Sequence, residues 1–170
     1  MRREGNAWGL PITLTKSITM EAGRDILSIG YLLEGLPPGR PLHFATEWNF
    51  AGMPSGADDR FFYDGNANRL GQLGTQLDLS HTRFLGLIDQ YLNLDVQLGL
   101  SKPSSIWTYP IETVSQSEGG FELVHQSICV MPHWMVQGDV EGKWSVQMEV
   151  AIGHTYIAKP RIGEYAAVLV

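Results

Sequence analysis

The stretch Leu92-Asn-Leu-Asp-Val-Gln-Leu-Gly-Leu100 places Leu or Val at every second position and Asn, Asp, Gln or Gly between them. Successive side chains of a β-strand point to opposite faces, so this period of two predicts a strand with one apolar face. Residues 144–152 repeat the pattern, with Trp, Val, Met, Val and Ile on one phase and mostly polar residues on the other. Two strands of this kind predict a sheet that covers a hydrophobic core.

The first fifty residues contain three more stretches with this period. In residues 12–20, Ile, Leu and Met alternate with Thr and Ser. Lys16 is the only polar residue at the positions that are otherwise apolar. Residues 27–33 predict a second strand. Residues 44–50 predict a third, with Phe, Thr, Trp and Phe on one face. The other face of this third strand carries His43, Glu47 and Asn49.

The middle of the chain contains one clear hairpin and one ambiguous segment. Residues 106–113 and 123–136 are rich in β-branched and aromatic residues, and Gly119-Gly120 between them is a turn signal, so they predict a β-hairpin. Residues 80–92 fit either a helix, with apolar residues at helical spacing, or a strand through 84–88.

Composition and turn spacing indicate an all-β protein. Of the 170 residues, 44% are hydrophobic and only 18% charged, with 19 Gly and 9 Pro that punctuate short strands. Short strands at regular spacing predict an antiparallel β-sandwich. We expect a single domain over residues 1–170, with 1–10 and 153–170 as loosely assigned ends.

Charge and hydropathy exclude several classes of partner. A net charge of −6 and a pI near 5.3 argue against nucleic acid, which binds clustered Lys and Arg. No run approaches the roughly 20 apolar residues of a membrane span. The lone Cys129 forms no internal disulfide and fits a reducing cytoplasm.

Familiar catalytic and metal-binding motifs are missing. No GxSxG, HExxH, phosphate-binding or dinucleotide-binding motif occurs, and the five histidines lack ligand spacing. The stretch Asp58 to Asn68 has the oxygen-rich composition of a calcium loop, but Arg69 stands where an EF-hand has glycine. We therefore interpret it as a polar turn, and expect neither a metal nor a cofactor.

Two segments combine polar and aromatic residues in the manner of a carbohydrate site. Sugar sites offer carboxylates and amides to vicinal hydroxyls and a flat ring to the C–H face of the sugar. The candidate sugar-binding residues are His43, Glu47, Asn49, Trp107, Glu112, Glu118, Gln126 and Trp134. The alternative is structural: the strand face is simply solvated, and the polar side chains tie the hairpin to the sheet.

Two motifs carry a family resemblance. The segments Leu42-His-Phe-Ala-Thr-Glu-Trp-Asn-Phe50 and Trp107-Thr-Tyr-Pro-Ile-Glu-Thr-Val-Ser-Gln-Ser-Glu-Gly-Gly-Phe-Glu122, with His125-Gln126, resemble the C-terminal β-sandwich domain of family 57 glycoside hydrolases, the α-amylase and 4-α-glucanotransferase group. The resemblance covers residues 10–152. It implies a supersandwich related to galactose mutarotase, packed against a catalytic (β/α) barrel that acts on α-glucans. The nucleophile and acid/base of that family lie on the barrel, so no catalytic residue is transferred to this chain.

Three functional hypotheses follow from these observations. The first is a non-catalytic accessory module that binds an α-glucan or another oligosaccharide. The second is a structural domain that docks onto a catalytic domain or a second copy of the chain. The third is a mutarotase-like enzyme in which His43 or His125 works with Glu112 or Glu118.

Overall fold

The computed structural model describes residues 1–117 and 119–154, and every regular element within them is a β-strand. No helix with the length and hydropathy of a membrane span occurs in this described part. The strands are β1 (Arg2–Ala7), β2 (Leu10–Met20), β3 (Ile26–Glu34), β4 (Leu42–Ala45), β5 (Trp48–Ala51), β6 (Arg60–Tyr63), β7 (Arg69–Gln72), β8 (Leu77–Asp89), β9 (Leu94–Ser117), β10 (Gly120–Val136) and β11 (Lys143–Gly153).

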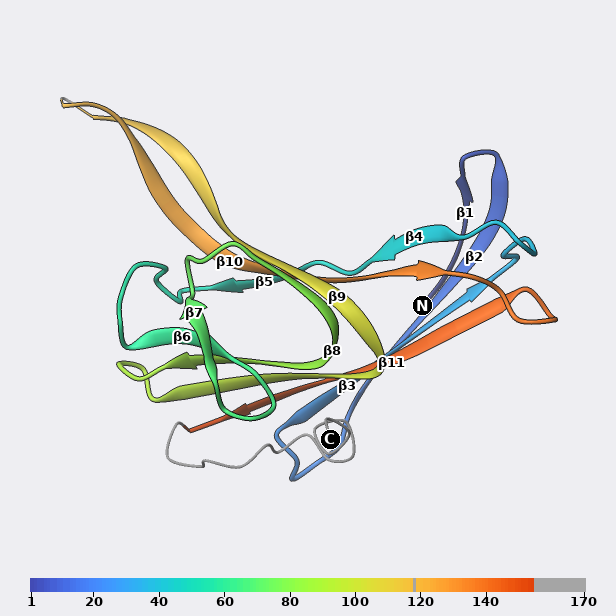
Figure 1. Cartoon of the computed structure of the whole chain (residues 1–170), viewed down its shortest axis with the longest axis horizontal. Coiled ribbons are helices and arrows are strands. Elements are labelled where there is room, and N and C mark those ends of the chain that lie inside the picture. The colour runs from blue at the N-terminus through green and yellow to red at the C-terminus, as the bar shows by residue number, and fades with distance from the viewer. Residues whose placement is uncertain (118, 155–170) are drawn as a thin grey trace.

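All strand pairs are antiparallel and belong to one hydrogen-bonded sheet with the order β1-β2-β3-β11-β9-β8-β6-β7. Strand β10 pairs with β9 on one side and with β4 and β5 on the other. The sheet forms two layers. The upper layer contains β4, β5, β10 and the second part of β9, and the lower layer contains β3, β11 and the first part of β9 (Figure 1). Strand β9 has 24 residues and therefore belongs to both layers. Its first part pairs with β11, and its second part pairs with β10, so the sheet folds over on itself (Figure 1).

The fold depends on a bend that β8 and β9 share. The register of this pair shifts between Leu79 and Thr82 and again between Thr82 and Phe84, and His81 has a φ of 54°. The Thr82 hydroxyl donates to the carbonyl of Phe84 at 3.0 Å. Irregular pairing of this kind increases strand curvature, so both strands turn together from one layer into the other.

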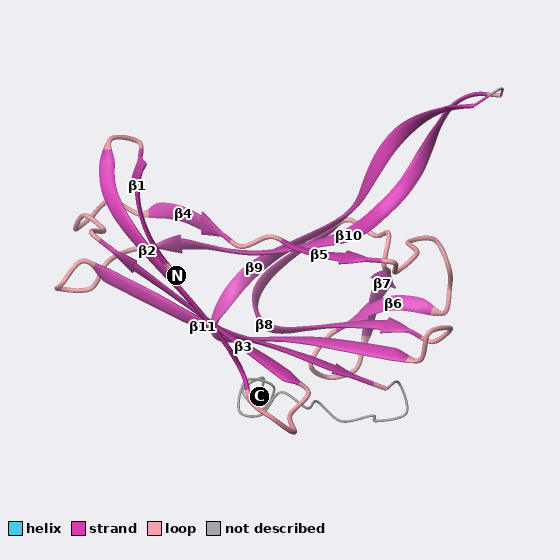
Figure 2. Cartoon of the chain, turned by 180° about the vertical axis from the view of Figure 1, so that it is seen from behind, coloured by secondary structure: helices cyan, strands magenta, loops and turns pink. Residues whose placement is uncertain are grey.

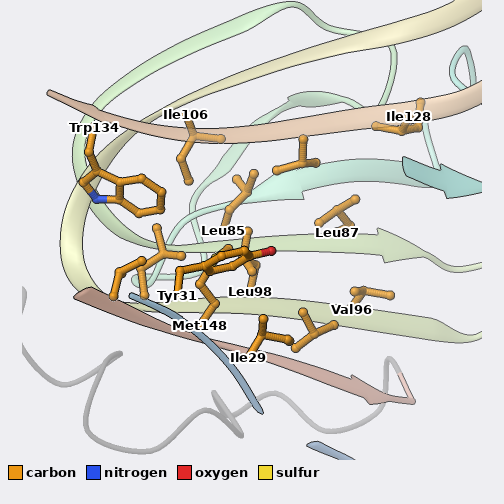
Figure 3. Packing of buried hydrophobic residues seen from close by; sticks show 14 of the residues in the cluster. Ile29, Tyr31, Leu85, Leu87, Val96, Leu98, Ile106, Ile128, Trp134 and Met148 are labelled. Carbon is orange, nitrogen blue, oxygen red and sulfur yellow. The ribbon is translucent and has the colours of Figure 1, made fainter. Parts of the chain in front are cut away.

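The core lies between the two layers. Ile29 and Tyr31 of β3, Met148 of β11, and Leu85, Leu87, Val96 and Leu98 of the lower layer face Ile106, Ile128 and Trp134 of the upper layer (Figure 3). These apolar side chains occupy alternate positions of their strands, which confirms the prediction of an antiparallel all-β fold with a half-buried pattern.

Two hairpins extend beyond the sandwich. The β1–β2 hairpin rises at one end and the distal part of the β9–β10 hairpin at the other, with β4, β5 and the middle of β10 between them (Figures 1 and 2). The upper layer therefore presents a face that is flanked by two raised arms.

Most predicted strands match the structure. Residues 12–20, 27–33 and 144–152 fall within β2, β3 and β11, and the hairpin around Gly119-Gly120 is β9–β10. The ambiguous segment 80–92 is strand until Asp89. Lys16 stands opposite Tyr31 on the neighbouring strand, and its ammonium lies 5.3 Å from the centre of the Tyr31 ring.

Two details of the predicted strands were wrong. Strand β9 begins at Leu94, because residues 90–93 form the turn from β8 and leave Leu92 exposed. The strand expected over 44–50 is interrupted at Thr46-Glu47, opposite Pro132 of β10. The Pro132 carbonyl accepts the N–H of Thr46 at 3.0 Å, but a proline has no N–H to donate in return, so the ladder lacks one bond there.

Candidate functional site

The outer face of the upper layer gathers several predicted site residues. Ile128, Val130 and Trp134 point into the core, so the residues between them in β10 point outward. Strand pairing places His43 of β4, Asn49 of β5 and Trp107 of β9 on this outer face. Glu47 lies just before β5, two residues from Asn49, and therefore on the same side of the chain.

Trp107 is the centre of a fixed cluster on this face. Its ring centroid lies 3.9 Å from that of His133, at an angle of 38°. Its indole N–H donates to Oδ1 of Asp78, on β8, at 3.1 Å. His43 Nε2 and His133 Nδ1 are hydrogen-bonded at 3.0 Å. We call Trp107, Asp78, His133 and His43 the Trp107 cluster, and its contacts hold the indole in one orientation.

The surroundings of His133 favour its neutral form. Burial lowers the pKa of His133, and the neighbouring His43 lowers it further, although the carboxylate of Asp78 opposes the effect. A bond between two imidazole nitrogens needs one proton between them, so the tautomer of one ring determines that of the other.

A depression with a volume of about 460 Å³ lies beside Trp107. Its lining includes Gln76, Asp78, Trp107 and Tyr109. Trp107 remains 37% exposed, so part of its ring is open to solvent. An aromatic ring, a carboxylate and an amide are the groups that a sugar site needs.

A second polar group lies farther along the same face. The Asn49 amide donates to Glu47 Oε1 at 2.8 Å, and Asn49, Cys129 and Tyr109 are register neighbours on three adjacent strands. A hydrogen bond with the Cys129 thiol, together with burial and the Glu47 charge, raises the pKa of Tyr109 to about 12.

His43 and Asn49 lie far apart on this face. Asn49 lies opposite residue 129 of β10, whereas His43 lies opposite residue 135. These six residues of β10 separate His43 from Asn49 by roughly 20 Å. Tyr109 lies between the two polar groups, because it is the register neighbour of residue 129 and also lines the depression beside Trp107. Glu47 and Asn49 share the face with the Trp107 cluster but lie outside the depression beside Trp107.

The other predicted site residues lie away from the Trp107 cluster. Glu112 is exposed at the base of the β9–β10 arm, opposite His125. The Gln126 amide lies at a register shift and donates to Thr113 Oγ1 at 3.1 Å, which ties the two strands together. Glu118 lies outside the described residues.

Trp134 belongs to the core rather than to the exposed face. It is 7% exposed, and its ring stacks on Phe44 with centroids 6.2 Å apart and lies 5.5 Å from Trp144. Its ring faces are therefore not available to a sugar on the outer face.

Sequence reasoning missed Asp78 and His133 as members of the site. The side chains of residues 132 and 134 in β10 point inward, so the alternation of a strand places the side chain of His133 on the outer face. The sequence could have shown this. Nothing in the sequence signals that Asp78 stands opposite Trp107, because that contact depends on the register of β8 against β9.

Within residues 1–117 and 119–154, no group of three or more His, Cys, Asp or Glu side chains could hold a metal ion. In the stretch Asp58 to Asn68, Asp64 Oδ1 accepts the backbone N–H groups of Asn66 and Asn68 at 2.9 and 2.8 Å. Burial raises the pKa of Asp64, but a hydrogen bond from the Asn68 side-chain amide at 2.9 Å, together with these backbone bonds, outweighs it and the net shift is downward. The loop thus uses its carboxylate to close a turn.

Comparison with known proteins gives one family and a shared fold. Residues 1–148 match the sequence model of the family described as "Alpha-amylase/4-alpha-glucanotransferase, C-terminal". No curated protein sequence matches the chain. The structure is similar to that of 4-alpha-glucanotransferase from Thermococcus litoralis, with a TM-score of 0.58 and 20% identity over 88% of this chain and 20% of that one.

A second similar structure is that of a putative aldose 1-epimerase from Escherichia coli K12, with a TM-score of 0.58 and 8% identity over 90% of this chain and 64% of that one. At these identities the two similarities show a common galactose-mutarotase-like fold alone. The chain spans about a fifth of the length of the glucanotransferase.

Proposed function

The chain belongs to the alpha-amylase/4-alpha-glucanotransferase C-terminal domain family, and from this premise we propose that it is an accessory domain that binds oligosaccharide on its outer face. The observation that carries the proposal is the Trp107 cluster. Asp78 and His133 fix the indole next to an open depression, so little side-chain entropy is lost when a sugar ring stacks on it.

The groups around Trp107 match a neutral, hydroxylated ligand. Oδ1 of Asp78 accepts the indole N–H, and the second carboxylate oxygen has lone pairs for sugar hydroxyls. Gln76 adds an amide at the same depression. The name of the family points to α-glucans as the first ligands to test.

Titration calorimetry with maltooligosaccharides and other glycans tests this proposal. We expect millimolar or tighter binding, weakened at least about tenfold by Trp107→Ala and Asp78→Ala. Trp8→Ala is the matched control, because Trp8 is 72% exposed on the β1–β2 hairpin and far along the chain from this cluster. The proposal fails if the folded protein binds no glycan.

We propose that the domain has no glycosidic chemistry of its own and that a separate catalytic domain supplies it. The mutarotase-like alternative needs an imidazole nitrogen that is free to act beside a carboxylate. Glu112 is the register partner of His125, but His125 Nε2 is bonded to the backbone carbonyl of Met53 at 2.9 Å, and His43 is bonded to His133. Polarimetry on a fresh aldose checks this, since a rate above that of buffer would contradict it.

One observation favours docking as a second function. The distal arm, residues 112–125 of the β9–β10 hairpin, carries Val114, Phe121 and Leu123 with 67%, 77% and 66% of their areas exposed. Val114 pairs with Leu123, and Phe121 lies two positions farther along the same strand, so the three share one face. Exposed apolar faces of this kind are typical of protein interfaces.

The docking surface is testable with the protein alone and with a partner. If it joins two copies, light scattering will give a dimer that Phe121→Ser returns to a monomer. If it meets a catalytic domain, the same substitution will weaken capture of a separately prepared glucanotransferase catalytic domain. Unchanged behaviour in both measurements would remove the arm as an interface.

A further inference from the structure

The two raised hairpins carry charge of opposite sign. We call the β1–β2 hairpin, residues 1–16, the basic arm, and its charged residues are Arg2, Arg3, Glu4 and Lys16. The charged residues of the distal arm are Glu112, Glu118 and Glu122. No Lys or Arg occurs from residue 103 to residue 142. The molecule therefore has one basic and one acidic arm, although its net charge is −6.

The exposed charges of both arms lack a partner within the described part of the chain. Arg2, Arg3, Glu112 and Glu122 are exposed, and none of them forms an ion pair with another described residue. Exposed charges of opposite sign on two surfaces steer those surfaces together and fix how they meet. The basic arm and the distal arm are therefore complementary in charge.

Trp8 lies at the tip of the basic arm in a backbone conformation that suits another residue. Trp8 and Gly9 are the central residues of the β1–β2 turn, with φ angles of 51° and 85°. Turns of this kind prefer Asn, Asp or Gly, and a positive φ is unusual for a bulky side chain. The indole is 72% exposed, so burial does not offset this strain. A strained, exposed aromatic side chain points to a contact with another molecule.

The distal arm presents the apolar surface that such a ring can cover. Val114, Phe121 and Leu123 share one face of this arm and are mostly exposed. Glu112 pairs with His125, two positions from Leu123, so its carboxylate borders the same face. The distal arm thus has an apolar face with an acidic edge, and the basic arm has an exposed indole with two arginines.

The two arms also match in length and direction. Strand β1 pairs with β2 over 6 residues, and residues 112–117 pair with 120–125 over the same number of positions. At about 3.3 Å per residue, each arm spans roughly 20 Å. Both arms rise from the same side of the molecule, at opposite ends of the upper layer (Figures 1 and 2).

We propose that two copies of the chain clasp each other as a two-fold dimer, in which the basic arm of each copy lies along the distal arm of the other. This inference deepens the docking function proposed above. A two-fold axis that turns the two upper layers toward each other also exchanges the ends of the molecule, so each of the two contacts joins unlike arms. The paired arms run in opposite directions, with the tip of one beside the base of the other.

Light scattering of the full chain and of two single-arm variants tests the clasp. We expect a dimer for the parent. Trp8→Ser and Phe121→Ser should each weaken the dimer at least about tenfold when alone, because each substitution alters both contacts of a two-fold dimer. An equimolar mixture of the two variants should dimerise better than either one, since one intact basic arm then meets one intact distal arm.

Met20→Ser and Tyr91→Ser are the matched controls. Their side chains are 72% and 77% exposed, as are those of Trp8 and Phe121, but they lie outside both arms. Both controls should dimerise as the parent does. A monomeric parent, or a single-arm variant that dimerises as well as the parent, would overturn the inference.

A charge exchange between the arms gives a second test. Arg2→Glu combined with Arg3→Glu places like charges on both arms and should weaken the dimer at least about tenfold. Adding Glu112→Lys and Glu122→Lys to the same chain makes the arms opposite in charge again and should recover most of the affinity. A dimer that is not recovered by the added lysines would contradict the pairing of unlike arms.

The possible results separate the clasp from the docking function. If the parent is a monomer while Phe121→Ser weakens capture of a glucanotransferase catalytic domain, the clasp is wrong and the docking function stands. If Phe121→Ser changes neither measurement, both fall. Glycan titration of Trp107→Ala is independent of either outcome, because Trp107 lies on neither arm.

Discussion

The indole of Trp107 and the imidazole of His133 lie 3.9 Å apart, centroid to centroid, on two neighbouring strands of the upper layer. Trp107 borders the depression of about 460 Å³, and His133 contacts its ring. The proposal for glycan binding therefore depends on how this pair is held, and the ionisation of His133 offers a direct way to perturb it.

Stability is expected to fall as the pH drops below 6.5. Burial and His43 lower the pKa of His133 from its ordinary value of 6.5, so the unfolded chain binds a proton at a higher pH than the folded chain does. The stabilisation is complete above 6.5 and is lost as the pH falls towards the folded-state pKa. Melting temperatures between pH 8 and pH 5 measure this loss.

His133→Phe keeps a ring against Trp107 and removes the titration, so its melting temperature should fall less over the same range. His81→Asn removes an exposed histidine and serves as the control. Equal slopes for His133→Phe and the parent would contradict the expectation.

Cys129 is expected to be unreactive in the folded protein. It is completely buried, and burial raises the pKa of its thiol although a hydrogen bond with Tyr109 opposes the shift. A thiol reacts as its thiolate. Because the chain has one cysteine, Ellman's reagent at pH 8 reports this site alone.

We expect the native protein to release no coloured thiolate from the reagent. The protein unfolded in guanidinium chloride should release one equivalent of it per chain. Thr19→Cys introduces an exposed thiol and should react at once. Rapid reaction of the native parent would show that Cys129 is accessible.

Gly86→Ala is expected to destabilise the protein by roughly 1–3 kcal/mol, the usual cost of overpacking. A Cβ at residue 86 would overlap the ring of Tyr63, which lies across this glycine. The hydroxyl of Tyr63 donates to Asp95 at 2.7 Å, so the ring cannot move without breaking that bond. Chemical denaturation measures the change.

Gly56→Ala is the control for this substitution, because a Cβ there meets nothing within 4 Å. Its effect should stay within about 0.5 kcal/mol. Equal stabilities of the two alanine variants would contradict the packing of Tyr63 over Gly86.

Arg60→Met is expected to cost roughly 3–5 kcal/mol of unfolding free energy, the usual penalty for leaving a buried charge unpaired. Asp89 is fully buried, and its carboxylate accepts Arg60 Nε at 3.0 Å and the N–H of Leu92 at 2.9 Å. The substitution removes the charged partner and leaves only the backbone bond.

Arg24→Met is the matched control, because the pair that Arg24 makes with Glu21 is exposed. Exposed pairs contribute little, so denaturation curves of this variant should overlay those of the parent. A comparable loss in both variants would show that the Arg60–Asp89 pair contributes no more than a surface pair.

Periodicity predicted the strands well because the side-chain alternation of a strand is a local property. The sequence placed Trp107, His43, Glu47 and Asn49 as candidates. Strand pairing puts Trp107, His43 and Asn49 on one face, and Glu47 accepts a hydrogen bond from Asn49 there. The sequence could not show that Trp134 is buried, because an aromatic residue in a strand looks the same whether a second layer covers it or not.

The sequence by itself determined the all-β class, the central hairpin and the strand faces, since each depends on neighbouring residues. Tertiary structure alone decided which cross-strand neighbours meet. The register of β8 against β9 brings Asp78 to Trp107, and that of β10 against β9 brings His133 to the same ring. A shift of one residue would send these side chains to the opposite face, and no local pattern encodes that register.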